Sequence, residues 1–574
     1  MDVITSTTTL SSNPISYTIN DTSTNDKIIS MDASAVPSLE AAGVKYYDFN
    51  SNEEDVFRIL ADNGFNYIRV RVWNDPYYTD DLGNKFGYGG GNCDLENCLA
   101  IGRRANKYGM KLLVDFQYSD FWADPGQQIL PKAWTGYNDS QIEDAVYNYT
   151  KDSLNYLLDN GIEVGMVQVG NETNDTMCGH SGDSTMEAIC GFFNAGSRAV
   201  REVYPNALVA VHFANPYNTG NYTWYAQQLK TYNVDYDVFG SSYYPYWHGT
   251  MENMASLLST IGKTYNKKIM LLETSYANCE LEGNEARSDG EGNTIYTKEY
   301  VENKYSDVCD LGYDFTVEGQ KNQMLELFET VFTDIYNGIG VSYWEGCWIS
   351  VNKSQSTTAE TKWSENEPYW EEYGCGWTSK YAYYYSSDHY EYKNGGCVIE
   401  NEAFFDETGH PFDSLTAFKT IRDTDYSSVS SKVVDITNGD FETDYAATGW
   451  TYDSSVIGEW PVEDDGVNST HSLKWYSEGT IEFDISQDVS GNSGSFTFSM
   501  EIRGGKTDTA YVYVIIDGVE YKSSNASFSA WNQFETLSVT FSQTSSQTVI
   551  VGLHVESNTT GTWGNADNAT LVMN

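Results

Sequence analysis

Two glutamates occupy chemically informative places in this sequence, because each lies at the end of an apolar run. Glu172 ends VGMVQVGNE directly after Asn171, and Glu273 ends the apolar part of IMLLET. Core packing does not explain a glutamate in such a place, although one alone could begin a solvated loop. Two carboxyl groups that flank a glycosidic bond can hydrolyse it. One protonates the leaving oxygen, and the other attacks the anomeric carbon or activates water.

Polar and aromatic residues also follow the other apolar runs. These residues are Arg69, Arg71, Asp120, His212, Tyr243, Tyr244, Trp344 and Glu345. Such a ring, rich in Trp and Tyr, is typical of a carbohydrate cleft. An arginine can keep Glu273 ionised, while Glu172, beside a carboxylate and an apolar wall, should have the raised pKa of an acid. The Asn171 amide can hold a sugar 2-hydroxyl, and we expect Tyr243, or secondarily Tyr244, to orient Glu273.

The elements that must position these residues alternate between short apolar runs and helical periodicity. Eight candidate strands cover 28–34, 66–73, 111–119, 164–172, 208–213, 238–245, 269–274 and 340–346. Near-continuous apolar runs are typical of parallel strands buried on both faces. Eight βα units within residues 28–425 therefore predict an α/β fold, a (β/α)8 TIM barrel, with chemistry at the carboxyl ends of its strands. Glu172 and Glu273 would end the fourth and seventh strands, about 5–5.5 Å apart, which predicts retention of configuration.

Composition excludes several other classes of function. The formal charge of −49 disfavours nucleic acid and anionic membranes as partners, whereas a neutral polysaccharide is unaffected by it. No run approaches the roughly 20 apolar residues that span a bilayer. The sequence has no GxGxxG after its first strand, no P-loop, no CxxC and no HExxH, so nucleotide and zinc chemistry lack support. We therefore expect no cofactor for the chemistry.

Nine cysteines all precede residue 400. An odd number leaves at least one without an intramolecular partner. Loop disulfides Cys93–Cys98, Cys178–Cys190 and Cys279–Cys309 are compatible with the spacing, but the sequence does not decide the connectivity.

The chain changes character after the predicted barrel. Residues 426–432 are a polar linker, and residues 433–574 show many alternating runs such as SFTFSMEI and AYVYVIIDG with almost no helical periodicity. Alternation with frequent turn signals predicts an all-β sandwich or jelly roll. Residues 1–27 are rich in Ser, Thr and Asn and carry no signal-peptide pattern, so we interpret them as a polar spacer.

Long stretches of the predicted barrel resemble glycoside hydrolase family 53, the endo-β-1,4-galactanases. The matching stretches include NYIRVRVWNDP, SDFWADPGQQILPKAW, VQVGNET, FGSSYYPYW, IMLLETSYA, VSYWEGCWI and ENEAFFDETGHPFDSL. The resemblance implies internal cleavage of β-1,4-galactan, the side chain of pectic type I arabinogalactan. It assigns Glu172 as acid/base and Glu273 as nucleophile. Arg69, Asn171 and Tyr243 would surround them, and Trp344 and Trp348 would be sugar platforms. Gln117 and Gly346 depart from the usual HYSD and YWEP patterns.

Bacterial members of the family resemble one another in a calcium site between the loops after strands seven and eight. In this chain Asp289, Glu291 and Asn293 alternate with glycines in SDGEGN, which suits a structural Ca²⁺ bound by oxygen atoms. Arg287 stands where a further ligand would be expected, and a solvated acidic turn explains the segment equally well.

The C-terminal segment resembles jelly-roll carbohydrate-binding modules. Its candidate stacking residues are Trp460, Trp475, Trp531 and Trp563, and its candidate calcium ligands are Glu442 and Asp567. A structural spacer without sugar affinity is the alternative.

Two further expectations concern the setting of the protein. Asn171 lies in the sequon NET, so a glycosylating host would block the predicted site, which favours a bacterial origin. A polysaccharide substrate implies secretion, and we expect a monomer. The alternatives for the function are another retaining endo-glycanase (a mannanase, xylanase or glucanase) or a non-catalytic polysaccharide-binding barrel.

Overall fold

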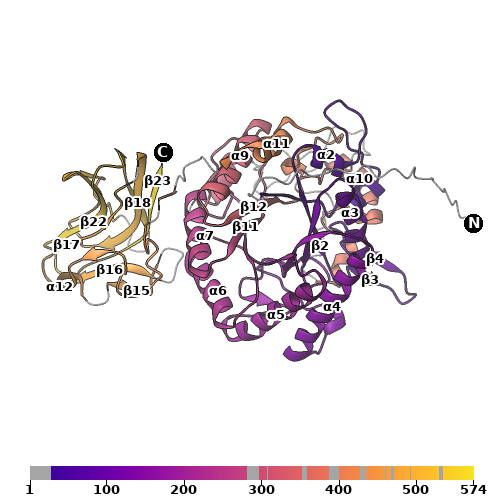
Figure 1. Ribbon diagram of the computed structural model, residues 1–574, viewed down its shortest axis with the longest axis horizontal. Coiled ribbons are helices and arrows are strands. Elements are labelled where there is room, and N and C mark those ends of the chain that lie inside the picture. Colours follow the sequence, from indigo (N-terminus) through magenta and orange to yellow (C-terminus); the bar gives the residue numbers. More distant parts are fainter. Residues whose placement is uncertain are drawn as a thin grey trace, which may run out of the picture.

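The computed structural model describes residues 27–280, 297–306, 308–351, 359–386, 400–426, 433–434, 436–458, 461–466, 471–491, 493–528 and 534–573. Within these ranges the chain forms a barrel and, beside it, a β-sandwich (Figure 1). Across the part of the chain so described, no helix is both long and apolar enough to cross a membrane.

Eight parallel strands close into the barrel in the order β1-β12-β11-β10-β9-β6-β5-β2. They are β1 (Ile28–Asp32), β2 (Tyr67–Val72), β5 (Lys111–Phe116), β6 (Val164–Val169), β9 (Leu208–Phe213), β10 (Val238–Ser242), β11 (Lys268–Glu273) and β12 (Gly338–Tyr343). All eight predicted strands are present, which confirms the TIM barrel. Since the observed strands end up to three residues earlier than most predicted runs, Glu172 lies on a loop.

Helices surround the barrel (Figure 1). They are α1 (Val36–Ala41), α2 (Val56–Asp62), α3 (Leu95–Lys107), α4 (Asp139–Asp159), α5 (Met186–Val203), α6 (Thr219–Thr231), α7 (Met251–Tyr265), α8 (Lys298–Lys304), α9 (Val317–Thr333), α10 (Ala359–Tyr373) and α11 (Ala417–Asp423). Side-chain caps fix several starts. The Asn138 and Gln141 pair forms a capping box on α4, and Asp94 accepts from Asn97 N at α3.

The interior of the barrel has two layers of different chemistry. Below the carboxyl ends of the strands lies an apolar layer, which we call the lower layer. It contains Ile28, Leu113, Met166, Ala210, Val238, Met270 and Leu272. Near the carboxyl ends lies a polar, fully or nearly fully buried layer, the upper layer. It contains Asp32, Arg69, Arg71, Asp115, Gln168, His212, Glu273 and Glu345. The barrel is therefore a packed core with chemistry confined to one end.

The sandwich consists of two antiparallel sheets. One has the order β15-β16-β23-β18-β21 with β13 paired to β23, and the other has the order β14-β17-β22-β19-β20. The bounds are β13 (Val433–Val434), β14 (Thr451–Tyr452), β15 (Val462–Glu463), β16 (Ser472–Ser477), β17 (Ile481–Asp488), β18 (Gly494–Gly505), β19 (Thr509–Ile516), β20 (Val519–Lys522), β21 (Glu535–Gln543), β22 (Val549–Ser557) and β23 (Thr562–Met573), with a short helix α12 (Ser454–Ile457). The predicted all-β fold is confirmed.

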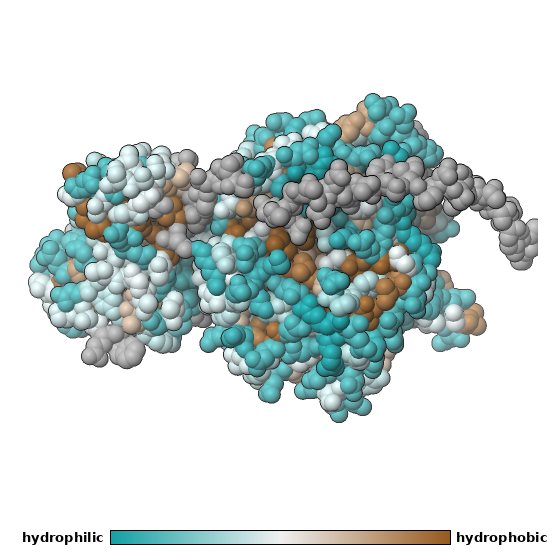
Figure 2. Space-filling view, viewed as in Figure 1, coloured by the Kyte–Doolittle hydropathy of each residue, from teal (hydrophilic) through white to brown (hydrophobic). Residues whose placement is uncertain are grey.

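In β18 the burial alternates residue by residue, so Phe496, Phe498 and Met500 enter the core while Thr497 and Ser499 face outward. Strands β13 and β23 lie against α7 of the barrel. Hydrophilic residues cover most of the face in Figure 2, and hydrophobic residues gather toward the middle of the barrel.

The cysteines correct one expectation. Cys93, Cys98, Cys178 and Cys190 are free thiols and buried, and Cys309 is also free, so none of the three disulfides considered from spacing is formed. Cys98 and Cys190 lie on helices α3 and α5, where they pack in the apolar core. Their spacing thus reflects core positions and not loop ties.

Candidate active site

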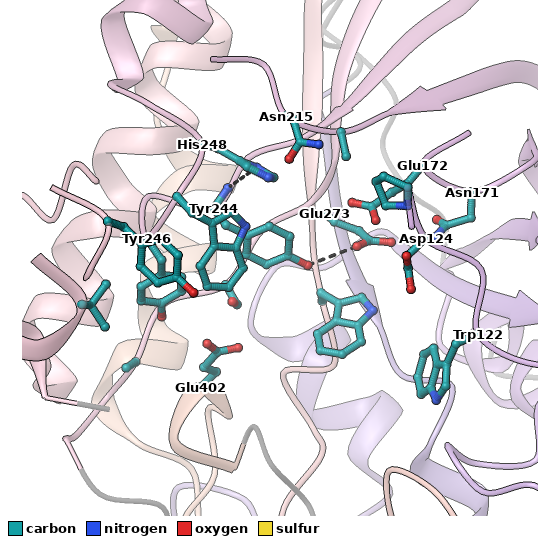
Figure 3. Close-up of a pocket in the computed structure, with 18 of the residues that line it drawn as sticks. Trp122, Asp124, Asn171, Glu172, Asn215, Tyr244, Tyr246, His248, Glu273 and Glu402 are labelled. Carbon is teal, nitrogen blue, oxygen red and sulfur yellow. Dashed lines mark hydrogen bonds between the residues drawn. The ribbon is translucent and has the colours of Figure 1, made fainter. Parts of the chain in front are cut away.

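A cavity of about 540 Å³ opens at the carboxyl ends of the barrel strands. Figure 3 shows carboxyl groups and aromatic rings directed into it from several loops. Its wall includes Trp122, Asp124, Asn171, Glu172, Tyr244, Tyr246, Glu273, Trp344, Trp377 and Glu402. Both predicted carboxyl groups therefore face one concave, partly aromatic site, as expected of a sugar-binding cleft.

Glu273 is the last residue of β11 and is held at both carboxyl oxygens. Arg69 Nη2 donates to its Oε1 at 2.7 Å, and the Tyr244 hydroxyl donates to its Oε2 at 3.1 Å. Burial raises the pKa of this carboxyl, and the Arg69 guanidinium opposes that rise. A carboxylate fixed between a cation and a hydroxyl is oriented to act as a nucleophile.

Glu172 has different surroundings. Burial raises its pKa well above the ordinary value, and the negative charge of Glu273 adds to the rise. The Ser242 hydroxyl donates to Glu172 Oε1 at 2.5 Å, and no cation is paired with this carboxyl among the described residues. Of the two carboxyl groups, Glu172 is therefore the one that holds a proton, which is the state a general acid needs.

His212, at the end of β9, supports Glu172 from below. The backbone N–H of Glu172 donates to His212 Nδ1 at 3.3 Å, and His212 Nε2 lies 2.9 Å from the Ser242 hydroxyl. Burial lowers the pKa of His212 well below its usual range, with the charge of Arg69 adding to the effect, so the ring is neutral. The contacts fit the tautomer with its proton on Nε2, which donates to Ser242 as Ser242 donates to Glu172.

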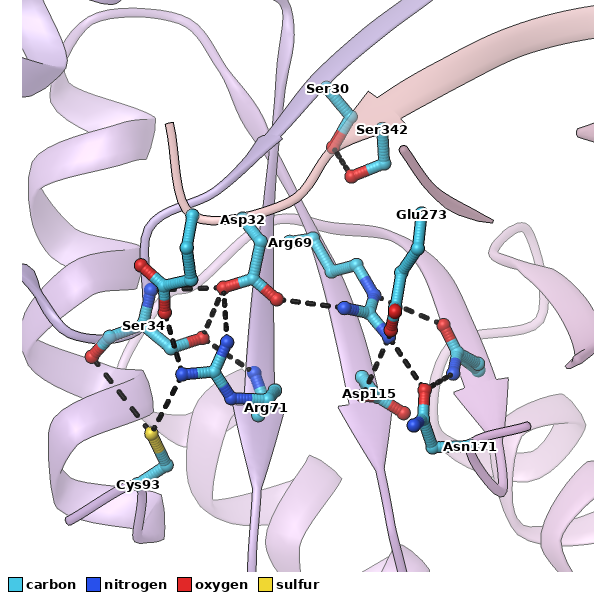
Figure 4. Close-up of polar contacts among 12 residues, drawn as sticks. Ser30, Asp32, Ser34, Arg69, Arg71, Cys93, Asp115, Asn171, Glu273 and Ser342 are labelled. Atoms are coloured by element: carbon cyan, nitrogen blue, oxygen red, sulfur yellow. Dashed lines mark hydrogen bonds and ion pairs between the residues drawn. The ribbon is translucent and has the colours of Figure 1, made fainter. Parts of the chain in front are cut away.

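An ion-pair network connects the residues below the cavity (Figure 4). Asp32 accepts from Arg69 Nη1 at 2.8 Å and from Arg71 Nη1 at 3.1 Å. Arg69 also contacts Asp115 at 2.9 Å, and Arg71 contacts Glu345 at 2.6 Å. Because these side chains are buried, water does not compete for their partners, and the network holds the Arg69 guanidinium against Glu273.

The backbone at the site is strained in the left-handed region. Glu172 has φ 44° and Glu345 has φ 49°, values that a non-glycine residue adopts at a cost of about 1–3 kcal/mol. The bonds described above to Ser242, His212 and Arg71 keep these residues in place. Strain retained at two carboxyl-bearing residues of one site is consistent with a functional requirement on where they point.

The tyrosine prediction was wrong in its first choice. The Tyr243 side chain is fully buried away from the cavity, and its hydroxyl donates to Gly249 O at 3.2 Å, whereas Tyr244 reaches Glu273. Strand β10 ends at Ser242, whose side chain points inward to Glu172. Alternation then directs Tyr243 outward and Tyr244 inward.

Two other predicted substrate contacts are also buried elsewhere. Trp348 is completely buried and stacks on Trp122 and Trp377, so it supports the cavity wall from behind, while Trp344 lines the cavity. Asp120 accepts from the backbone N–H groups of Asp75 and Lys132, at 3.1 and 2.8 Å, and ties two loops together.

Arg69, Asn171 and His212 were expected to bind substrate. Arg69 and His212 are fully buried and act on the glutamates. Asn171 lines the cavity, with its Oδ1 accepting from Arg69 and its Nδ2 donating to Ala123 O at 2.8 Å.

Several cavity residues escaped prediction, notably Asp124, Tyr246, Trp377 and Glu402. Three of them lie on loops and Glu402 ends a short 3₁₀ helix, where no periodicity indicates which way a side chain points. The motifs SDFWADPGQ and ENEAFFDETGHP were the available signals for Asp124 and Glu402.

The metal predictions have two outcomes. Asp289, Glu291 and Asn293 lie outside the described residues. Within the described part of the chain, no group of three or more His, Cys, Asp and Glu side chains could hold a metal ion. Glu442 accepts from the backbone N–H of His471 at 2.6 Å.

Among the tryptophans of the sandwich, Trp475 is core, since it is 2% exposed and contacts Phe483. Trp563 is half-buried, and Trp460 and Trp531 lie outside the described residues.

The chain is similar to known proteins. The family Glycosyl hydrolase family 53 matches residues 28–418. An endo-β-1,4-galactanase of Bacillus subtilis (strain 168) is 43% identical over 394 residues, covering 69% of this chain and 86% of that protein. An arabinogalactan endo-β-1,4-galactanase of Cellvibrio japonicus (strain Ueda107) is 31% identical over 356 residues, covering 60% and 84% respectively. The solved family 53 catalytic domain of Ignisphaera aggregans has a TM-score of 0.57 and 33% identity, covering 69% of this chain and 96% of that one.

Proposed function

This chain belongs to glycosyl hydrolase family 53, and from that membership we propose that it is a retaining endo-β-1,4-galactanase that cuts internal bonds of type I arabinogalactan. One observation carries the proposal. A single cavity presents two glutamates in opposite surroundings: Glu273 contacts a guanidinium and a tyrosine hydroxyl, whereas Glu172 has no ion-pair partner among the described residues. That asymmetry separates a nucleophile from an acid.

In the first step, a Glu273 carboxylate oxygen attacks the anomeric carbon while the glycosidic C–O bond breaks. The proton of Glu172 passes to the departing sugar oxygen, so the leaving group departs as a neutral alcohol. Arg69 and Tyr244 hold Glu273 during the attack, and the product is a glycosyl ester on Glu273.

In the second step, Glu172 is ionised and takes a proton from water. The water oxygen attacks the anomeric carbon, the ester C–O bond breaks, and Glu273 leaves as a carboxylate. Two inversions give net retention. The balance of protons needs no cofactor, because the proton that Glu172 gave up is returned by the water.

The substrate class rests on three supports. The relatives named above are galactanases, a formal charge of −49 favours a neutral polymer over a polyanion, and Trp122, Trp344 and Trp377 supply apolar faces for sugar rings. We infer further that the enzyme is secreted, because its polymeric substrate does not enter cells, and that it is a monomer. We also propose that residues 433–574 are a carbohydrate-binding module.

A polysaccharide panel tests the proposal. We expect reducing sugar to be released from β-1,4-galactan and much less from mannan, xylan and cellulose, and proton NMR to detect the β-anomer first. A first product of α configuration would refute retention. Faster hydrolysis of another polymer would refute the substrate, and the runner-up would be another retaining endo-glycanase.

The module is tested separately. Residues 433–574 are removed from the full chain, and binding to insoluble galactan is compared by pull-down. If the shortened enzyme binds insoluble galactan as strongly as the full chain does, this segment is a spacer.

A further inference from the structure

A third carboxyl group faces the active-site cavity, and the double displacement does not use it. Glu402 ends the 3₁₀ helix η5 (Glu400–Glu402), and its side chain lines the same cavity as Glu172 and Glu273. Figure 3 shows the Glu402 carboxyl directed into the cavity, opposite the rings of Tyr244 and Tyr246. Burial raises the pKa of this carboxyl to about 7.

The backbone around Glu402 is fixed in place by the barrel. Its carbonyl oxygen accepts from the Tyr343 hydroxyl at 2.6 Å and from Gln320 Nε2 at 2.9 Å. Asn278 donates to the carbonyl groups of Asn401 and Ala403, at 2.6 and 2.8 Å. A loop residue held on both sides by buried groups presents its side chain in one preset position, as a substrate-binding group requires.

Two hydroxyl groups, those of Ser275 and Tyr246, lie near the Glu402 carboxyl. Ser275 and Tyr246 are two residues beyond Glu273 and Tyr244, so the same two segments that build the nucleophile site also build this corner. Both hydroxyls are near enough to lower the pKa of Glu402, against the larger effect of burial. Yet both hydroxyl oxygens are buried, and neither makes a hydrogen bond of normal geometry to any described residue. Unsatisfied buried donors beside a carboxylate are costly, and such contacts often tighten when a substrate binds.

We propose that Glu402 is a substrate-binding residue whose carboxylate accepts hydrogen bonds from the hydroxyl groups of one sugar unit in the cleft. Tyr246 and Ser275 act through it as positioning residues, donating to the carboxylate when the sugar is bound. The identity of that sugar as a galactopyranose rests on the proposed function. Charge-assisted bonds to sugar hydroxyls would make this corner a determinant of specificity, because a sugar that lacks the matching hydroxyl leaves the carboxylate unpaired.

The test uses the full-length chain and first identifies, with the polysaccharide panel, the polymer that the wild type cuts. That step tests the proposed function alone. Glu402→Ala and Glu402→Gln are then measured on oligosaccharides of that polymer with increasing length. We expect kcat/KM of the alanine variant to fall about 10- to 100-fold once the oligosaccharide is long enough to reach the subsite, and to be unchanged below that length. The glutamine variant should lose less, since its amide oxygen still accepts.

Controls separate binding from folding. Glu318→Gln, on the exposed side of α9, should match the wild type at every length. Tyr246→Phe should lower kcat/KM on long substrates in the wild-type background and have no further effect in the Glu402→Ala background, as expected if it acts through Glu402. An equal loss at every substrate length, or alanine kinetics within twofold of the wild type throughout, would overturn the proposal.

Discussion

The two layers inside the barrel are built on the same eight strands and differ in almost everything else. The lower layer is apolar, and every strand contributes a side chain to it or packs against it. The upper layer contains two arginines and four carboxyl groups that are all buried, including Asp115 and Glu345. Burying charge costs several kcal/mol per ion before pairing, so the upper layer is not explained by stability.

The difference indicates a division of labour along the strands. The lower layer packs like any protein interior and closes the barrel, whereas the upper layer holds a fixed electrostatic environment for Glu172 and Glu273. Strained backbone at Glu172 and Glu345 belongs to the same end. If the division is correct, substitutions in the two layers should separate activity from stability.

The largest expected effect is on activity in the upper layer. Glu273→Ala should lower kcat on galactan by at least about 10⁴-fold, because the glycosyl ester can no longer form. The thermal midpoint should change little, since one of several like charges is removed from a crowded site. Initial-rate kinetics and circular dichroism measure the two quantities.

Added azide assigns the roles of the two glutamates. It should rescue Glu273→Ala by giving the α-galactosyl azide, and rescue Glu172→Ala by giving the β-azide. The reverse pattern would exchange acid and nucleophile, and full activity of either variant would end the mechanism.

Arg69→Met should affect activity and stability together. It leaves Asp115 and Glu273 buried without their cation, and Asp32 with Arg71 alone. Breaking a buried pair in this way costs about 3–5 kcal/mol, and the pKa of Glu273 should rise further once Arg69 no longer opposes burial. Denaturant unfolding and the acid limb of the kcat/KM profile, which should move to higher pH, check the two parts. A stable Arg69→Met protein with an unshifted acid limb would show that the network is not what sets the nucleophile's charge.

Met270→Ala tests the lower layer. Met270 is fully buried among the apolar side chains of β5, β6 and β10, so its truncation should cost about 2–5 kcal/mol through the cavity it leaves. At a temperature where the variant stays folded, kcat should remain within about twofold of the wild type. Thermal denaturation and kinetics at 25 °C measure this. A tenfold loss of kcat in the folded variant would mean that the two layers are mechanically coupled.

The sequence predicted the strands and the polar residues at their carboxyl ends better than it predicted the directions of individual side chains. Apolar runs bounded by polar residues were sufficient for eight strands and for the glutamate pair, because burial on both faces leaves a strong signal. Alternation of side chains does not hold at every strand end. The pairing of β10 and β11 shifts register between Ser241 and Ser242, and Leu272 and Glu273, adjacent in sequence, both point into the barrel. A local irregularity of this kind re-aims side chains and cannot be deduced from alternation.

Aromatic residues show a second limit. Trp344 and Trp348 both follow strand β12. Trp344 lines the cavity, whereas Trp348 is fully buried behind it. A tryptophan side chain suits an apolar core and a sugar-stacking surface equally well, so its role depends on what packs against it. Here that neighbour is Trp377, which follows helix α10.

The smallest expected effect concerns a proton in the upper layer. Burial raises the pKa of Asp115 from 3.8 to about 7, with Arg69 opposing and the charge of Glu273 adding to the rise. Between these two pH values the folded protein keeps a proton that the unfolded chain has released. The stability from this group is therefore complete below about pH 3.8 and is lost as the pH rises through about 7.

Asp115→Asn removes that titration, so the thermal midpoint of the variant should fall less than that of the wild type between pH 4 and 8. Between pH 4 and 8 the free energy of unfolding should fall by at least about 1 kcal/mol more in the wild type than in the variant, since one pKa unit corresponds to about 1.4 kcal/mol. Asp152→Asn, on the exposed face of α4, is the matched control and should follow the wild type. If Asp115→Asn also follows the wild type, the proton of the upper layer resides on another carboxyl group. Glu345, whose pKa burial raises to about 8, would then be the residue to replace.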